Sequence, residues 1–316
     1  MFIRQPMSRS LSELILTDQE KSWLLSTFPH GLVVFDLETT GLSPLVNKII
    51  EIAAIKLDGN GVITFFHQLV NPMVEMSPEN SAIHGLYNAD LVDMPGLRHP
   101  LKDFFNFAGD LSLWAHNGVF DAGFLIRGAH ELNIQLPALR IYDSCRLIKT
   151  YYKSKEKKPE NFKLVTLADY FSFKFHSHMA MNDSVVLIKI MAQVINVATQ
   201  EEFKSSHEKA YVFSLKDFKS PNLNHFPSHL REMISYVEKR TPLAIRYDGG
   251  NVKGEWREII PLAFLPMPRG PVLLGKCLNT QQHKSYVLKL VKEFKVMEKV
   301  MPTPPIEPEI EVTDVQ

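Results

Sequence analysis

The chain is poor in cysteine and has no long apolar run. Its 316 residues include only Cys145 and Cys277, which lie far apart and form no zinc-binding pattern. So few cysteines exclude a disulfide framework and suit a reducing cytoplasm. No stretch of 18 or more apolar residues occurs, and the N-terminus lacks the apolar core of a secretion signal, so neither a membrane span nor a signal peptide is expected. We therefore expect a cytoplasmic protein, and the length predicts two domains.

The chain also lacks net charge, with 35 basic and 35 acidic residues, but the balance is uneven along it. Residues 201–301 carry 17 Lys and Arg against 11 Asp and Glu, whereas residues 302–316 carry four acids and no base. The proline-rich acidic tail is expected to be disordered. The modestly basic segment is compatible with nucleic-acid binding and equally with an inert surface.

Two carboxylates stand close together in an apolar run near the start of the chain. Asp36 and Glu38 lie in the stretch VVFDLETTG, at residues 33–41, which predicts a buried strand followed by a turn. Residues i and i+2 of a strand point to the same face, so both side chains project together. Adjacent anions raise each other's pKa unless a cation lies between them, and a hard divalent ion is the simplest candidate. The alternative is a strand end in solvent that carries two ordinary surface acids.

The order of the predicted elements indicates an α/β domain. After a helical extension at residues 1–30, residues 31–200 predict a three-stranded antiparallel meander and then alternating helices and strands around a mixed sheet. Residues 201–240 predict a helical connector. Residues 241–301 predict short strands separated by Gly and Pro turns, which are typical of a small β-barrel.

Two further acids and a histidine follow in the first domain. Asp121 opens a predicted helix, where the helix dipole by itself favours an acid. Asp183 begins an apolar helix, where it would serve as an N-cap. His178 precedes Asp183 by five residues, so it is expected on the incoming loop. Each residue therefore also has an ordinary structural explanation.

Taken together, these residues closely resemble the motifs of the DEDDh, or DnaQ-like, group of 3′–5′ exonucleases, which includes the proofreading epsilon subunit of DNA polymerase III. The first motif is FDLETTGL at residues 35–42, the second HNGVFD at residues 116–121, and the third H-x-A-x-x-D at residues 178–183. A segment IHGL at residues 83–86 matches a secondary feature of the group. The resemblance covers residues 30–198 and implies an RNase H-like fold.

The same resemblance implies a metal-dependent exonuclease that hydrolyses phosphodiester bonds from the 3′ end. Two divalent ions, Mg²⁺ or Mn²⁺, would be held by Asp36, Glu38, Asp121 and Asp183. His178, with an ordinary pKa of about 6.5, would act as the general base. The resemblance also implies that the substrate is contacted by Thr39, Thr40, Leu42, His84 and Asn117.

Simpler explanations exist for some of these substrate contacts. Thr40 has an ordinary role in making the turn that follows the strand, and His84 is explained equally well as a helix residue.

The C-terminal stretch is similar to the WYL domain, an Sm- or SH3-like barrel of bacterial regulators. The segment REIIPL at residues 257–262 fits this pattern, but VLL at residues 272–274 replaces the Trp-Tyr-Leu strand. VLKL at residues 287–290 replaces the arginine-containing strand, so the usual ligand binding is not expected. A dimer or protein contact, a solvated face, or a surface for single strands would each explain the remaining basic and aromatic residues, which are Arg246, Tyr247, Lys253, Trp256 and Arg257.

Three classes of function remain, and an active exonuclease is favoured because no acid of the motifs is missing. We expect single-stranded DNA as its substrate, in DNA replication or repair, and an exoribonuclease of the same family is the alternative because recognition of the 2′-hydroxyl cannot be read from the sequence. A catalytically silent nucleic-acid-binding protein would be expected to have lost an acid. A ligand-sensing regulator built on the barrel would need a DNA-reading helix-turn-helix.

Overall fold

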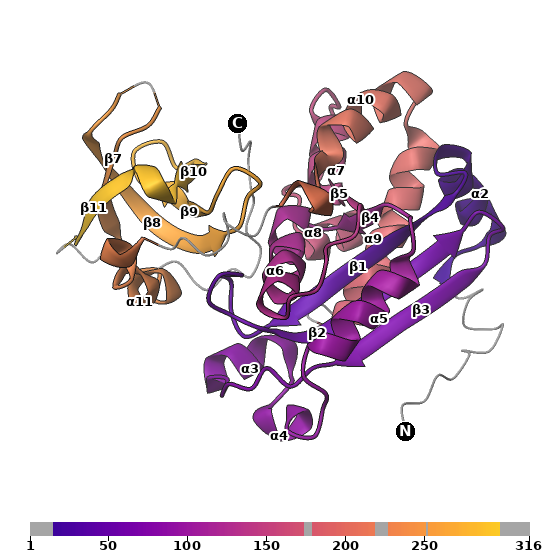
Figure 1. Cartoon of the computed structure of the whole chain (residues 1–316). Helices are drawn as coiled ribbons and strands as arrows, with labels where there is room; N and C mark the ends of the chain where they lie inside the picture. The colour runs from indigo at the N-terminus through magenta and orange to yellow at the C-terminus, as the bar shows by residue number, and fades with distance from the viewer. Residues whose placement is uncertain (1–14, 174–178, 219–226, 251, 298–316) are drawn as a thin grey trace.

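The computed structural model describes residues 15–173, 179–218, 227–250 and 252–297. Its larger part is a six-stranded mixed sheet in the order β3-β2-β1-β4-β5-β6 (Figure 1). Strand β1 pairs antiparallel with β2 and parallel with β4, while β5 pairs parallel with β4 and antiparallel with β6. The strands are β1 (Gly31–Thr39), β2 (Ile49–Asp58), β3 (Ile63–Leu69), β4 (Leu113–Ala115), β5 (Arg140–Asp143) and β6 (Tyr211–Ser214).

Helices cover both faces of this sheet because β1 alternates its buried side chains between them. Val33, Phe35 and Leu37 enter one apolar cluster with α5 and α6, whereas Leu32 and Val34 enter a second cluster with α2, α7, α8, α9 and α10. The helices of this part are α2 (Asp18–Thr27), α3 (Pro78–His84), α4 (Asn88–Leu91), α5 (Arg98–Ala108), α6 (Gly118–Glu131), α7 (Ser144–Tyr152), α8 (Leu164–Tyr170), α9 (Ala180–Val197) and α10 (Gln200–Ala210).

A second, five-stranded antiparallel sheet follows, in the order β10-β9-β8-β7-β11. Its inner face and a short helix enclose an apolar cluster that includes Ile245, Phe264 and Leu273. The elements of this C-terminal unit are η3 (Ser228–Leu230), α11 (Met233–Glu238), β7 (Leu243–Tyr247), β8 (Glu255–Leu265), β9 (Val272–Cys277), β10 (His283–Val287), η4 (Leu288–Leu290) and β11 (Val291–Val296).

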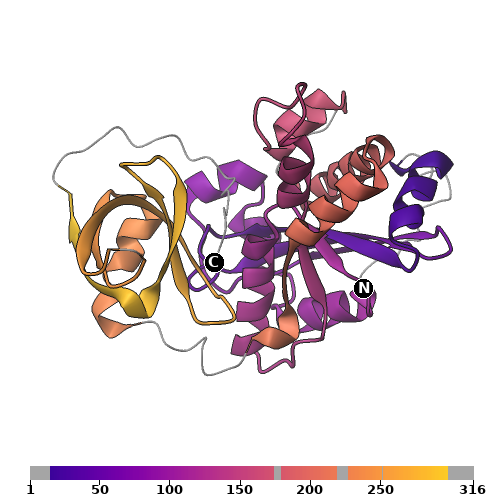
Figure 2. The same ribbon diagram turned by 90° about the horizontal axis from the view of Figure 1, so that it is seen from above.

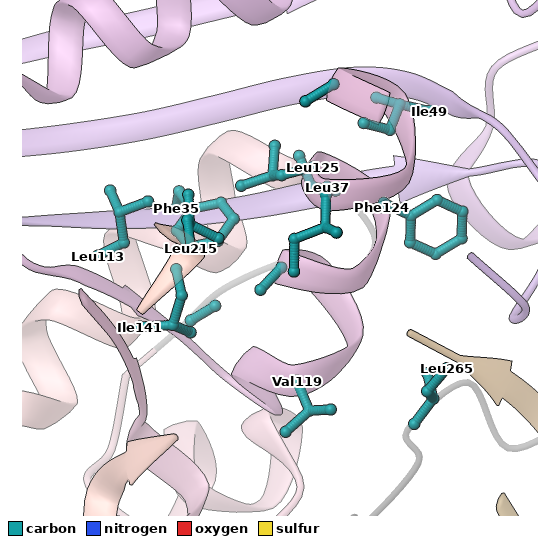
Figure 3. Packing of buried hydrophobic residues seen from close by; sticks show 14 of the residues in the cluster. Phe35, Leu37, Ile49, Leu113, Val119, Phe124, Leu125, Ile141, Leu215 and Leu265 are labelled. Carbon is teal, nitrogen blue, oxygen red and sulfur yellow. The ribbon is translucent and has the colours of Figure 1, made fainter. Parts of the chain in front are cut away.

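The C-terminal unit packs beside α6, at one end of the main sheet (Figures 1 and 2). The two units share one apolar cluster, in which Leu265 of β8 joins Phe124 of α6 and Phe35 of β1 (Figure 3). The loop between β1 and β2 also crosses the junction. Its Leu45 packs against the C-terminal core, and the backbone N–H of Phe264 donates to Ser43 Oγ at 3.2 Å.

The mixed α/β sheet of the first domain is confirmed, but the closed Sm- or SH3-like barrel of a WYL-type domain is not. Within the described residues, β10 and β11 are the outer strands of an open sheet and do not pair with each other. The predicted helical connector at residues 201–240 also contains a strand and 3₁₀ turns, η1 (Leu215–Asp217) and η3. Strand β6 pairs with β5, so the main sheet continues beyond residue 200.

The predicted surface for single strands on the C-terminal unit is divided in the structure. Tyr247 is buried, and its hydroxyl accepts from the backbone N–H of Val287 at 3.2 Å. Arg257 donates to the carbonyl of Val252 at 2.6 Å, while Trp256 stays exposed. These side chains therefore do not form one continuous platform.

One helix among the described residues, α9, is long and apolar enough to cross a membrane by length and composition. More than half of its apolar window is buried inside the fold, where it packs against β1 and β2. Such burial is typical of the core helix of an α/β sheet. The predicted acidic tail at residues 302–316 lies outside the described residues.

Candidate active site

Three of the predicted acids meet where β1 ends beside the first turn of α9. Asp36 and Glu38 lie on the β1 face that carries Leu32 and Val34, which is the face that α9 covers. Asp183 lies in the first turn of α9. One carboxylate oxygen from each of Asp36, Glu38 and Asp183 lies within 4.8 Å of the others. The helix begins at Ala180, so Asp183 is not the N-cap that the sequence suggested; Met179 holds that position.

Asp121 lies next to this group, in the first turn of α6, and is buried. The backbone N–H of Leu37, which lies on β1 between Asp36 and Glu38, lowers the pKa of Asp121, so the Asp121 carboxylate faces β1 at this point. Burial raises the pKa of Asp121, and the charges of Asp143 and Asp183 raise it further, although backbone N–H donors oppose the shift. Burial and like charges therefore outweigh the backbone N–H donors in setting the pKa of this carboxyl.

The electrostatics of the site are those of crowded anions. Burial raises the pKa of Asp36 well above its usual range, and the charges of Asp183, Asp121 and Glu38 raise it further. Burial and the charge of Asp183 act in the same way on the pKa of Glu38. A set of carboxylate oxygens at this separation fits a hard divalent cation such as Mg²⁺ or Mn²⁺, which prefers oxygen ligands.

The raised pKa values predict how the metal-free protein responds to pH. Native Asp36, Glu38 and Asp121 hold protons at pH values where the unfolded chain, with pKa values of about 4, has lost them. The native state therefore binds more protons in this window, and stability falls as pH rises from about 4 through the raised values. In EDTA, we expect the melting temperature to fall between pH 5 and pH 8.

Added Mg²⁺ or Mn²⁺ should reverse this fall at pH 8, because the ion binds the ionised carboxylates. Differential scanning fluorimetry with and without EDTA measures both effects. A melting temperature in EDTA that rises between pH 5 and pH 8, with no response to either ion, would contradict the assignment.

A cavity of about 880 Å³ opens over these acids. All five residues predicted to contact substrate line it, namely Thr39, Thr40, Leu42, His84 and Asn117. Two of them also hold the turn after β1. The Thr39 hydroxyl donates to the carbonyl of Gly41 at 2.7 Å, and the Thr40 hydroxyl accepts from the Lys48 N–H at 3.0 Å. Their roles toward substrate stay predictions.

The two described histidines of the cavity have their ring nitrogens engaged by neighbouring groups. His116 donates from Nε2 to the carbonyl of Phe162 at 2.8 Å, and its Nδ1 lies 3.0 Å from Ser144 Oγ. His84 accepts at Nδ1 from the Leu86 N–H, and its Nε2 faces Asn80 Oδ1 at 3.3 Å. The predicted general base, His178, lies outside the described residues.

Several cavity residues were missed by the sequence analysis. Asn80 bridges His84 to β1, because its Nδ2 donates to the carbonyl of Thr39 at 3.3 Å. The IHGL segment pointed to this helix but not to Asn80. Lys239 and Arg240 also line the cavity, although they belong to the C-terminal unit. No local pattern placed them near the acids, because the approach depends on packing between the two sheets.

Comparison with known proteins identifies the family. A family model described as Exonuclease matches residues 33–191, which is half of the chain. The PolC-type DNA polymerase III of Caldanaerobacter subterraneus subsp. tengcongensis is 31% identical over 195 residues, covering 61% of this chain and 13% of that protein. The corresponding protein of Staphylococcus aureus is 32% identical over 188 residues, covering 57% of this chain and 13% of that protein. The chain thus spans about an eighth of the length of these relatives.

The chain also aligns with the solved structures of two nucleases. Cell-death related nuclease 4 aligns with a TM-score of 0.48 and 15% identity, over 54% of this chain and 64% of that one. Exonuclease X, in complex with 5′-overhanging duplex DNA, aligns with a TM-score of 0.41 and 20% identity, over 56% of this chain and 99% of that one. On the strength of the family model, the chain belongs to the exonuclease family, which confirms the expectation of a hydrolytic exonuclease.

Proposed function

We propose that the protein is a 3′–5′ exonuclease that removes nucleotides from single-stranded DNA with the help of two divalent ions, Mg²⁺ or Mn²⁺. The observation that carries this proposal is the meeting of Asp36, Glu38 and Asp183 within 4.8 Å, with Asp121 beside them in one cavity. The charges of these acids raise the pKa values of their neighbours, so the group favours binding of a compensating cation.

In this proposal the four carboxylates hold the ions, and the rest of the cavity holds the 3′ end. The ions, when bound, would activate a water molecule and stabilise the charge that develops on the departing 3′ oxygen. His178 accepts the proton of the attacking water as general base. Thr39, Thr40 and Leu42 surround the terminal nucleotide, with His84 and Asn117 near the substrate.

DNA is proposed as the substrate because the two relatives named above are DNA polymerases. A role in replication or repair follows from the same likeness. The volume of the cavity does not distinguish deoxyribose from ribose, since recognition of RNA depends on a contact to the 2′-hydroxyl.

The test uses 5′-labelled single-stranded DNA and RNA of one sequence, incubated with the protein and Mg²⁺ or Mn²⁺. We expect a ladder of products that shortens one nucleotide at a time from the 3′ end of the DNA, and no products in EDTA. A DNA with a blocked 3′ terminus is the substrate control and should stay intact.

Three results would count against the proposal. Internal cuts in the blocked DNA would indicate an endonuclease, and a ladder that persists in EDTA would remove the role of the ions. A ladder from RNA alone would replace the proposed substrate with RNA and identify an exoribonuclease.

A further inference from the structure

The cations of the cavity come from outside the exonuclease domain. Among the described residues that line it, Lys239 and Arg240 are the only lysine and arginine. Both follow α11, in the C-terminal unit. A nucleic acid brings a negative charge with every nucleotide, and the exonuclease domain lines this cavity with carboxylates. The C-terminal unit also lines the cavity with Glu238, so its three charged residues there carry one net positive charge, which is the sign that a polyanion needs.

The backbone of Arg240 is unusual for an arginine. Its φ is 51°, in the left-handed region that glycine normally occupies after a helix. Its N–H donates to the carbonyl of Val237 at 3.0 Å, and the N–H of Thr241 donates to that of Tyr236 at 2.9 Å, so the chain makes a tight helix stop. Glycine adopts this left-handed conformation with less strain, so an arginine at this position indicates that its side chain has a function.

A basic residue at the end of a helix also has a purely structural explanation, because it complements the helix dipole. Arg240, however, is 92% buried while it lines the cavity, and a dipole interaction does not require either property. Lys239 stands next to it and is exposed. The pair thus combines an anchored cation with an accessible one.

The position of this pair relative to the acids is fixed by packing. Ser43 Oγ accepts from the backbone N–H of Phe264, and Val46 packs against the C-terminal core. Val46 itself lines the cavity, as does Val237 of α11. The loop after the first acidic motif and the end of α11 therefore form adjoining walls of one cleft.

We infer that Lys239 and Arg240 form a phosphate-binding wall for the part of the substrate strand that lies 5′ of the terminal nucleotide. This inference rests on the proposed function, since a 3′ end held at the carboxylates leaves only the 5′ direction for the strand to continue. The cavity of about 880 Å³ is near the upper end of the range for ligand pockets, about 300–1,000 Å³, so it has room beyond one nucleotide.

The test compares two substrates, a DNA dinucleotide and a DNA decanucleotide. The dinucleotide has only the phosphate that is cleaved, whereas the decanucleotide has further phosphates on its 5′ side. The variant combines Lys239→Gln with Arg240→Gly, because glycine suits the left-handed backbone and favours folding. The control combines Arg231→Gln with Lys289→Gln, which removes the same charge from exposed positions of the C-terminal unit outside the cavity lining.

We expect the ratio of kcat/KM for the decanucleotide to that for the dinucleotide to fall by about tenfold or more in the variant, mainly through KM. The control should keep the ratio of the parent protein. The slope of log kcat/KM for the decanucleotide against log salt should become shallower by about 1.4, at about 0.7 per lost phosphate contact. A second variant that combines Lys239→Gln with Arg240→Lys should regain part of the ratio lost in the first variant, because lysine retains the positive charge at position 240.

The outcomes separate this inference from the proposed function. If the parent protein hydrolyses neither substrate, the proposed function fails. If it hydrolyses both and the variant behaves like the control, the phosphate-binding wall is excluded while the exonuclease stands. Equal losses on both substrates, or an unchanged salt slope, would assign the pair a structural role and overturn the inference.

Discussion

Replacing Asp36 with Asn should abolish nucleotide release, lowering kcat by at least about 10³-fold, because the amide removes one anionic ligand from the centre of the acidic group. The side chain keeps its shape, so the loss measures charge rather than packing. Steady-state hydrolysis of the labelled DNA at saturating Mg²⁺ provides the measurement. Asp103→Asn is the control, since Asp103 is exposed on α5 and does not line the cavity.

The same Asp36→Asn change should stabilise the metal-free protein at neutral pH. Burial and four neighbouring carboxylates raise the pKa of Asp36, so its ionised form is unfavourable in the fold. We expect a melting temperature about 2–6 °C above the parent in EDTA at pH 7.5, and a smaller difference at pH 5, where the parent carboxyl retains its proton. A variant that loses activity and also melts lower in EDTA would show that Asp36 has a structural role.

Replacing His178 with Ala should lower kcat by about 10²–10⁴-fold, the range expected for loss of a general base. The affinity for Mn²⁺ should stay that of the parent, because the carboxylates that hold the ions remain. The acidic limb of the pH–rate profile should disappear, since the titrating base has been removed. Metal titration by calorimetry and rates between pH 5 and pH 9 measure the two effects.

The matched control for His178 is His176→Ala, which removes the same ring two positions away in the sequence. It should retain parent activity within about threefold. If the two variants lose activity equally, or if His178→Ala weakens Mn²⁺ binding, the general base has been misassigned.

The first acidic motif could be predicted in detail because it depends on local rules. An apolar run with two acids at spacing two gives a buried strand whose acids share one face, and β1 places Asp36 and Glu38 in that way. The start of α9 was less certain, since Asp183 can cap a helix or lie in its first turn. In the structure the helix begins three residues earlier, at Ala180, so Asp183 lies in its first turn beside β1.

Features that depend on contacts between distant segments could not be predicted. The sequence of β6 predicts part of a helical connector. In the structure, this strand pairs with Arg140 and Ile141 of β5 at the edge of the main sheet. The short strands of the C-terminal unit suggested a closed barrel, whereas closure depends on pairing between its outer strands. The placement of Lys239 and Arg240 depends on how that unit docks, which composition does not encode.

The apolar cluster shared by α6, β1 and β8 limits which substitutions this protein can accept during evolution. Leu265 and Phe124 belong to one core, so a substitution on either side must be accommodated by the other. The two sheets are therefore expected to unfold as one cooperative unit and to be inherited together. An exonuclease domain excised at residue 200 would lose β6 and leave the outer side of α6 uncovered, so we expect this fragment to be less stable than the whole chain.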